Sequence, residues 1–219
     1  MRRSWPDDRQ QTELAFAQLV QTVQACRRCP RMEGRTRVLG PANGLVSARI
    51  VFVAEAPGRF GADASGTPLS GDRTGRTFEE LLGAASLSRR EIFITNAVLC
   101  NPRDQAGRND RPTRTEIANC GQHLRDLIQI LDPAWVVSLG NVALQALARL
   151  APHECLLRRD VAKPVLWFDR WLLPLYHPGP QALLHRSLEV QRADYARLGE
   201  LVKDKKNLGT PPTPVLAGY

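Results

Sequence analysis

The sequence has no hydrophobic run long enough to span a membrane. Its longest apolar stretches, 49–56 and 134–140, are short and interrupted, whereas a transmembrane helix needs about 20 apolar residues. The first residues carry two arginines but no apolar stretch or small-residue cleavage site, so no secretory signal is visible. We therefore expect a cytoplasmic protein that has no membrane partner.

The composition of the 219 residues is that of an ordinary soluble globular protein. Hydrophobic residues make up 43% and charged residues 24%, and no internal repeat is evident. The length fits one domain with a substantial core. We expect that domain, residues 1–204, to be monomeric and the tail, residues 205–219, to be disordered.

Acidic residues are fewer than basic ones, so the chain carries a net charge of +8 and has a pI near 9.8. This balance allows either a solubilising surface or a polyanionic partner. The arginines favour the polyanion, because they crowd two loop-like segments, 27–37 and 103–114, that both lie beside cysteines. We therefore expect a polyanion, such as a nucleic acid, as the partner.

Five cysteines in a chain expected to be cytoplasmic do not indicate a disulfide framework, and metal or cluster ligation is the better interpretation. Cys26 and Cys29 have C-x-x-C spacing, Cys100 closes a strand-like segment, and Cys120 lies in a helix-like one. One close pair with two dispersed cysteines suits an iron–sulfur cluster held between elements of a folded domain. A structural zinc site and unrelated buried thiols remain open. Cys155 has no partner in the pattern.

Hydrophobic periodicity predicts strands that alternate with helices. Such alternation favours an α/β fold, which we expect to be a single-domain three-layer sandwich around a mainly parallel four-stranded sheet. Thr113 and Glu116 form a capping box at the start of one helix, and Asp169 and Arg170 are expected to form a tight turn. The strand-like segments are 48–58, 91–96, 134–140, 164–168 and 171–177, and the helical ones are 10–24, 78–85, 113–131, 141–150 and 188–202.

Ligands of such sheets bind beyond the carboxyl ends of the strands. Three strand ends carry polar or glycine-rich sequences, at 55–58, 95–96 and 177–178. We therefore expect these three segments to meet in one site.

Four segments, taken together with the cysteines, resemble the uracil-DNA glycosylase superfamily, in particular its two iron–sulfur families, commonly numbered four and five. AEAPG (54–58) resembles the first motif of family four, whereas GADASGTPLSGDRTGRTF (61–78) is closer to family five. ITNAVLCNP (94–102) is similar to the strand that carries the base-reading asparagine and a cluster cysteine. YHPGPQALLHR (176–186) resembles the last motif. The resemblance covers residues 14–200.

The resemblance implies a monofunctional enzyme that flips uracil out of DNA and hydrolyses its N-glycosidic bond. It also implies a [4Fe-4S] cluster on Cys26, Cys29, Cys100 and Cys120. Three alternatives stay open: a glycosylase with another base range (hypoxanthine, xanthine or mismatched uracil), a non-catalytic uracil-DNA-binding module, and a redox-sensing cluster protein. A covalently trapping relative is disfavoured, because it would need a nucleophilic histidine, and 34–122 contains none.

The resemblance also assigns roles to residues at the strand ends. The carboxamide of Asn96 would pair with N3–H and O4 of uracil, with help from the backbone of Glu55 and Ala56. His177 would donate a hydrogen bond to O2 as negative charge builds up on the departing base. Without the resemblance, Asn96 and His177 would each be read as ordinary loop residues.

A carboxylate is needed to orient the attacking water and to stabilise the positively charged sugar. Asp63 falls at the family-five position for this residue and is the choice that we expect. Glu55, in the family-four motif, is the second candidate. Asp72 lies in a turn-like G-D-R sequence and is expected to be structural.

The sequence departs from the family pattern in two ways. Leu69 stands where these families carry a phenylalanine that stacks on the base, and Phe60 is the aromatic residue that could replace it. The segment 105–110 is an insertion that either contacts DNA phosphates or is simply solvated. Beyond the last motif, Leu183 and Leu184 are expected to wedge into the DNA duplex; the alternative is that they are the buried start of the last helix.

Overall fold

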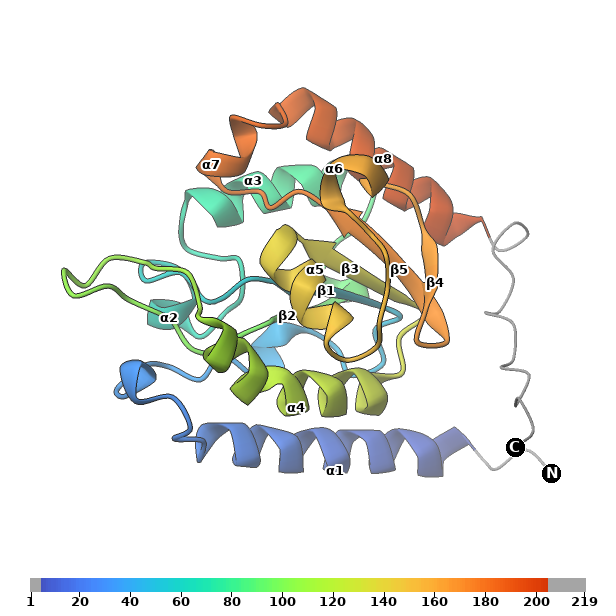
Figure 1. Ribbon diagram of the computed structural model, residues 1–219. Helices are drawn as coiled ribbons and strands as arrows, with labels where there is room; N and C mark the ends of the chain where they lie inside the picture. Colours follow the sequence, from blue (N-terminus) through green and yellow to red (C-terminus); the bar gives the residue numbers. More distant parts are fainter. Residues whose placement is uncertain (1–4, 205–219) are drawn as a thin grey trace.

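The computed structural model describes residues 5–204, with side chains from residue 9 on, and the tail expected to be disordered lies outside them. One five-stranded sheet, in the order β2-β1-β3-β5-β4, is covered by helices on both faces (Figure 1). The strands are β1 Ile50–Ala54, β2 Ile92–Asn96, β3 Trp135–Leu139, β4 Val165–Trp167 and β5 Arg170–Leu175. The α-helices are α1 Trp5–Gln24, α2 Ala62–Ser65, α3 Arg73–Ala84, α4 Arg114–Leu131, α5 Asn141–Ala148, α6 Leu157–Asp160, α7 Pro180–Leu183 and α8 Leu188–Lys203; the 3-10 turns are η1 Pro30–Met32, η2 Pro41–Asn43 and η3 Arg89–Glu91.

The α/β sandwich is confirmed, but the sheet has five strands where we expected four. β2, β1, β3 and β5 are parallel, and the short β4 pairs antiparallel with β5 at one edge. The turn that joins β4 to β5 is centred on Phe168 and Asp169, at φ +49° and +59°. Positive φ at both central residues is the mark of a tight hairpin turn, and it places the turn one residue earlier than expected.

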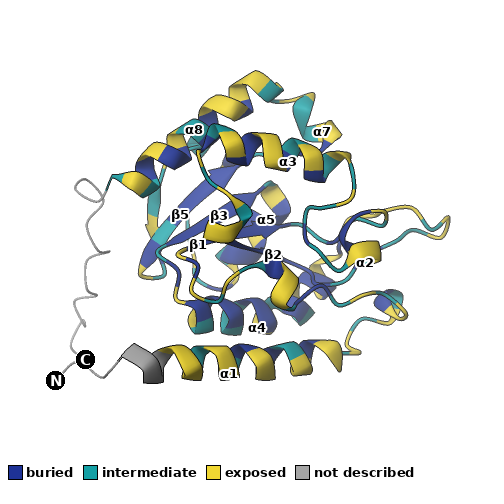
Figure 2. Ribbon diagram, turned by 180° about the vertical axis from the view of Figure 1, so that it is seen from behind, coloured by how far each residue is buried: buried dark blue, intermediate teal, exposed yellow. Residues whose placement is uncertain are grey.

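The sheet separates two hydrophobic cores, because successive side chains of a strand point to opposite faces. In β1, Val51 and Val53 face α1, α4 and α5, whereas Phe52 faces α3 and α8. All residues of β1, β2 and β3 are buried, as expected of parallel strands covered on both faces. In Figure 2 the strands are dark, and the helices show exposed residues on their outer sides.

Helix α4 starts at the predicted capping box. The Thr113 side chain accepts a hydrogen bond from the Glu116 N–H at 3.2 Å, and Glu116 accepts one from the Thr113 N–H at 2.7 Å.

No helix within residues 5–204 is both long enough and apolar enough to cross a membrane.

Candidate active site and cysteine cluster

A cavity of about 820 Å³ lies at the carboxyl ends of the parallel strands, within the usual size range of ligand sites. All three expected strand ends meet there, because the carboxyl ends of parallel strands lie at one edge of the sheet. Its wall includes Glu55 and Ala56 after β1, Asn96 at the end of β2, and His177 after β5. Leu69, from the loop before α3, also lines it.

His177, on the cavity wall, is held as a neutral ring with one nitrogen occupied by a hydrogen bond. The Gly179 N–H donates to Nδ1 of the ring at 3.0 Å. Burial lowers the pKa of His177 to about 4, and the charge of Asp72 raises it only in part. The ring is therefore neutral at pH 7, and because Nδ1 accepts a hydrogen bond, its proton is on Nε2.

Asn96 offers an unused donor to a ligand. The side chain is 3% exposed and lies on the cavity wall. Its Nδ2 has no hydrogen-bond partner among the residues that the structure describes. Leaving a buried amide unpaired is costly, so the site is built for a molecule with an acceptor at this point.

The two candidate carboxylates have different surroundings. Glu55 lies on the cavity wall, where burial raises its pKa and the charge of Arg111 opposes that rise. Asp63 does not line the cavity, although its side chain is only 8% exposed. It accepts hydrogen bonds from the Arg103 guanidinium at 2.6 Å and from the Thr36 N–H at 3.0 Å. The structure therefore favours Glu55 over Asp63, the reverse of the order expected from the sequence.

The two residues considered for stacking on the base, Leu69 and Phe60, also differ in their position relative to the cavity. Leu69 lines the cavity with φ +46°, a conformation that non-glycine residues rarely adopt. Arg89 fixes this loop by donating to the carbonyls of Pro68 and Leu69. Phe60 is 72% exposed and does not line the cavity, and the Arg59 guanidinium lies 4.2 Å from its ring centre. Leu69 is thus placed to contact a base in the cavity, and Phe60 is not.

The two leucines of the last motif are outside the cavity wall. Leu183 ends α7, and Leu184 is 84% exposed. The last helix begins only at Leu188, so its buried start does not include them. An exposed apolar side chain near a cavity mouth is the geometry that a wedge requires.

Among the cavity residues, Asn101 was not found from the sequence, and Asp72 was expected only to be structural. Asn101 is buried and donates to the Pro57 carbonyl at 2.6 Å and to Asn109 Oδ1 at 3.0 Å. It therefore fixes the loop after β1 against the loop after β2. Its place directly after Cys100 was the signal that could have suggested such a role. Asp72, expected to be structural, caps α3 by accepting from the Gly75 N–H at 2.8 Å, and it also lines the cavity.

The four expected ligand cysteines come from three separate segments. Cys26 and Cys29 precede η1, Cys100 follows β2, and Cys120 lies in α4. Their thiols lie within mutual electrostatic range: burial raises the pKa of Cys100 to about 12 and that of Cys120 to about 11, and neighbouring cysteines add to both. Cys155 is not among these neighbours.

The chemistry of this donor set fits an iron–sulfur cluster. It consists of thiols alone, and two of the sulfurs accept hydrogen bonds, Cys26 from Arg28 Nε at 3.5 Å and Cys29 from Asn119 Nδ2 at 3.3 Å. Hydrogen bonds to sulfur are a usual feature of such sites. In the described part of the chain, no group of three or more Cys, His, Asp or Glu side chains is placed to hold a metal ion.

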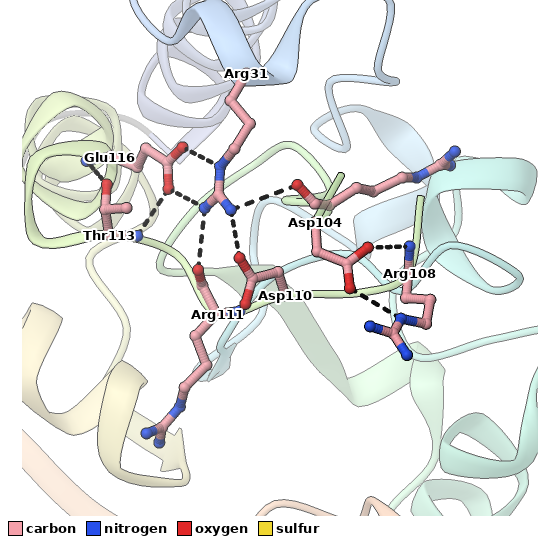
Figure 3. A network of polar contacts seen from close by, with 8 residues as sticks. Arg31, Asp104, Arg108, Asp110, Arg111, Thr113 and Glu116 are labelled. Atoms are coloured by element: carbon pink, nitrogen blue, oxygen red, sulfur yellow. Dashed lines mark hydrogen bonds and ion pairs between the residues drawn. The ribbon is translucent and has the colours of Figure 1, made fainter. Parts of the chain in front are cut away.

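Arg31, two residues after Cys29, links the cysteine segment to the cavity rim (Figure 3). It donates to both carboxylate oxygens of the buried Glu116, at 2.9 and 2.7 Å. It also donates to Asp110 at 2.6 Å and to the Arg111 carbonyl at 3.0 Å. We call these contacts the Arg31 network; it joins the cysteine segment to residues 110–116, two parts of the chain that are far apart in sequence.

Comparison with known proteins matches the model of the uracil DNA glycosylase superfamily to residues 41–197. A type-4 uracil-DNA glycosylase of Archaeoglobus fulgidus is 31% identical over 86% of this chain and 94% of its own. A type-4 enzyme of Thermotoga maritima is 33% identical over 78% and 84%, respectively. A type-5 uracil-DNA glycosylase of Thermus thermophilus is 31% identical over 58% and 69%.

Proposed function

The chain belongs to the uracil DNA glycosylase superfamily, and we propose that it is a monofunctional glycosylase that hydrolyses the N-glycosidic bond of uracil in DNA. The observation that carries the proposal is the pair of unused donors, Nε2–H of His177 and Nδ2 of Asn96, on one cavity wall. Two carbonyl oxygens on a small planar ring, as in uracil, are the acceptors that suit them.

The reacting bond is inaccessible inside a duplex, so the nucleotide must flip out of it. The cavity would receive the flipped base. Asn96 would donate to O4 of the flipped base and accept from N3–H. As the C1′–N1 bond breaks, its electron pair passes to the base and negative charge builds up on O2. A neutral His177 that donates from Nε2 would stabilise that charge where it develops.

We propose that Glu55, rather than Asp63, orients the water that attacks C1′ and accepts its proton. The cavity position of Glu55 and the pKa raised by burial support this role. Asp63 would need to leave Arg103 and Thr36 to reach the sugar. It remains the second candidate.

A [4Fe-4S] cluster on Cys26, Cys29, Cys100 and Cys120 is part of the proposal. The thiol-only donor set and its N–H⋯S hydrogen bonds support it. When bound, such a cluster would cross-link the segment before η1, the loop after β2 and helix α4. The proposed partner is DNA, with the exposed Leu184 as the wedge. The cytoplasmic location and the monomeric state stay predictions.

A broader base range is the second candidate function, and Leu69 favours it. An aliphatic side chain on the cavity wall restrains the flipped base less than an aromatic ring does. Such a pocket would accept hypoxanthine or xanthine in addition to uracil.

The experiment is a cleavage assay on oligonucleotides that each contain one uracil, hypoxanthine or xanthine, single-stranded and in duplexes. We expect alkali-labile abasic sites at uracil. Binding of uracil DNA without any abasic product would contradict the proposal and would support the non-catalytic module.

The two carboxylates are then compared in single-turnover reactions. A positioned general base contributes about 10²–10⁴-fold, so Glu55→Gln should lose that much and Asp63→Asn less than about ten-fold. A more damaged Asp63→Asn enzyme would instead restore Asp63 to the role expected from the sequence.

A further inference from the structure

The segment that follows Cys100 forms a small hairpin at the cavity mouth, residues 103–109. Arg103 and Asn109 pair as an isolated antiparallel bridge, and the Asp104 N–H donates to the Arg108 carbonyl at 2.9 Å. Gly107 has φ +73°, which the turn requires. The hairpin contains most of the insertion, residues 105–110, for which the sequence left both a phosphate contact and a solvated loop open.

Most arginines around this hairpin already have partners. Arg103 pairs with Asp63, and Arg108 pairs with Asp104 at 2.9 Å. Arg59, from the loop after β1, donates to the Gly107 carbonyl at 2.6 Å. Arg31 is the centre of the Arg31 network. These four guanidinium groups hold the loops together and are not free for a ligand.

Arg111 is different. It is exposed, it lies on the cavity wall, and its guanidinium makes no hydrogen bond or ion pair that the structure records between residues 5 and 204. Both polar groups of its backbone are held by hydrogen bonds. The N–H donates to Asp110 Oδ1 at 2.8 Å, and the carbonyl accepts from Arg31 at 3.0 Å. Figure 3 shows its side chain extending away from the Arg31 network.

The charge of Arg111 also reaches into the site, because it opposes the rise in the pKa of Glu55. A free cation within electrostatic range of the carboxylate lies near the place where the sugar of a flipped nucleotide must sit. The phosphates on either side of that sugar are the nearest anions that DNA would bring.

We propose that Arg111 binds a phosphate next to the flipped nucleotide and that Arg31 holds its backbone in place for this contact. The inference rests on the proposed function. An arginine suits this task because its guanidinium can donate two parallel hydrogen bonds to one phosphate and is always charged. Arg31 is a positioning residue in this arrangement, and Arg111 touches the substrate.

The test is DNA binding by Arg111→Met as a function of salt concentration. The probe is a duplex with 2′-fluoro-2′-deoxyuridine, which the protein can bind without cleaving. Removing one phosphate contact should weaken binding roughly ten-fold and should make the slope of log K against log salt shallower by about 0.9. The matched control is Arg108→Met, which removes one arginine charge three residues away, from a guanidinium already paired with Asp104, and should leave the slope unchanged.

The phosphate itself is tested with an uncharged methylphosphonate on either side of the uridine. One of the two substitutions should weaken binding by the wild-type protein roughly ten-fold and should have no further effect on Arg111→Met. A slope equal to that of the wild type, or a methylphosphonate penalty that persists in Arg111→Met, would overturn the inference. If Arg111→Met shifted only the pH profile of excision and left the salt slope unchanged, the inference would also fail, because Arg111 would then act on Glu55.

These results are separable from the proposed function. If the wild-type protein excises uracil but Arg111→Met keeps its salt slope, only the inference fails. If the wild-type protein neither excises uracil nor prefers uracil-containing DNA, the proposed function fails and the inference falls with it.

Discussion

The Gly179 N–H donates to Nδ1 of His177 at 3.0 Å, and this one hydrogen bond determines which ring nitrogen carries the proton. Gly179 also lies against the ring itself, since a Cβ at this position would be 2.8 Å from Nδ1 and 3.2 Å from Cε1. The orientation of this imidazole, which we propose to be catalytic, thus depends on the absence of a side chain two residues later.

Gly179→Ala is therefore expected to displace His177 without unfolding the protein. The backbone of Gly179, at φ −78° and ψ 158°, is one that alanine adopts freely, so the methyl group acts on the ring alone. Losing one well-placed donor at a developing oxyanion costs about 10²–10³-fold in rate. Single-turnover excision measures the loss, and an unchanged melting temperature is the control. Full activity in Gly179→Ala would show that the ring tolerates displacement.

The pH dependence of excision should have an acid limb that belongs to Glu55. Glu55 must be deprotonated to accept a proton from water, and burial raises its pKa. The rate should therefore fall, as the pH is lowered, at a higher pH than an ordinary glutamate would give. His177, with a pKa of about 4, is already neutral in that range. The limb should disappear in Glu55→Gln; a limb that persists there would belong to another group.

Asp63→Asn should affect stability more than chemistry. The substitution removes the charge that faces Arg103 at 2.6 Å in a nearly buried pair. Hydrogen bonds to charged groups contribute about 1.5–3 kcal/mol, so we expect the free energy of unfolding to fall by about that amount. Denaturant titration measures it. Glu79→Gln, which breaks the more exposed pair with Arg89, is the control and should cost less.

Leu69→Phe should raise activity on uracil and narrow the range of accepted bases. Leu69 lies on the cavity wall in a loop that Arg89 fixes, and aromatic stacking is worth about 1–3 kcal/mol per base. Rates on uracil, hypoxanthine and xanthine substrates, compared with those of Phe60→Leu, separate the two positions. If Leu69→Phe leaves every rate unchanged, position 69 does not contact the base.

Substitution of any proposed cluster ligand by serine should remove the brown colour of the protein. Each ligand holds one iron, so iron content should fall from about four atoms per chain. Cys155→Ser should keep both colour and iron, because its thiol is not among the neighbours of the other four. A colourless wild-type protein with one stoichiometric zinc would contradict the cluster. The proposed ligands are Cys26, Cys29, Cys100 and Cys120.

The sequence predicted the site better than it predicted the contacts within it. The meeting of 55–58, Asn96 and His177 follows from parallel strands, whose carboxyl ends share one edge whatever the details of packing. The partner of Asp63 could not be predicted in this way, because Arg103 is 40 residues away and no local pattern links the two. A carboxylate on a glycine-flanked loop fits catalysis and an ion pair equally well until the fold brings one partner to it.

The sheet, too, could be predicted from the sequence only in part. Buried strands were visible as apolar runs, but whether 164–168 joined the sheet depended on a turn with two positive φ values at Phe168 and Asp169. Neither residue is a glycine, so the sequence lacked the usual sign of such a turn. Tertiary packing on the edge of β5 favours it instead.

The Arg31 network also sets an order of events during synthesis of the chain. Arg31 and Glu116 are separated by 85 residues, and ribosomes add about 5–20 residues per second. Arg31 therefore leaves the ribosome roughly 4–17 s before its buried partner does. During that interval the first two cysteines are already outside while helix α4 does not yet exist, so the N-terminal segment cannot adopt its final structure while it is being made.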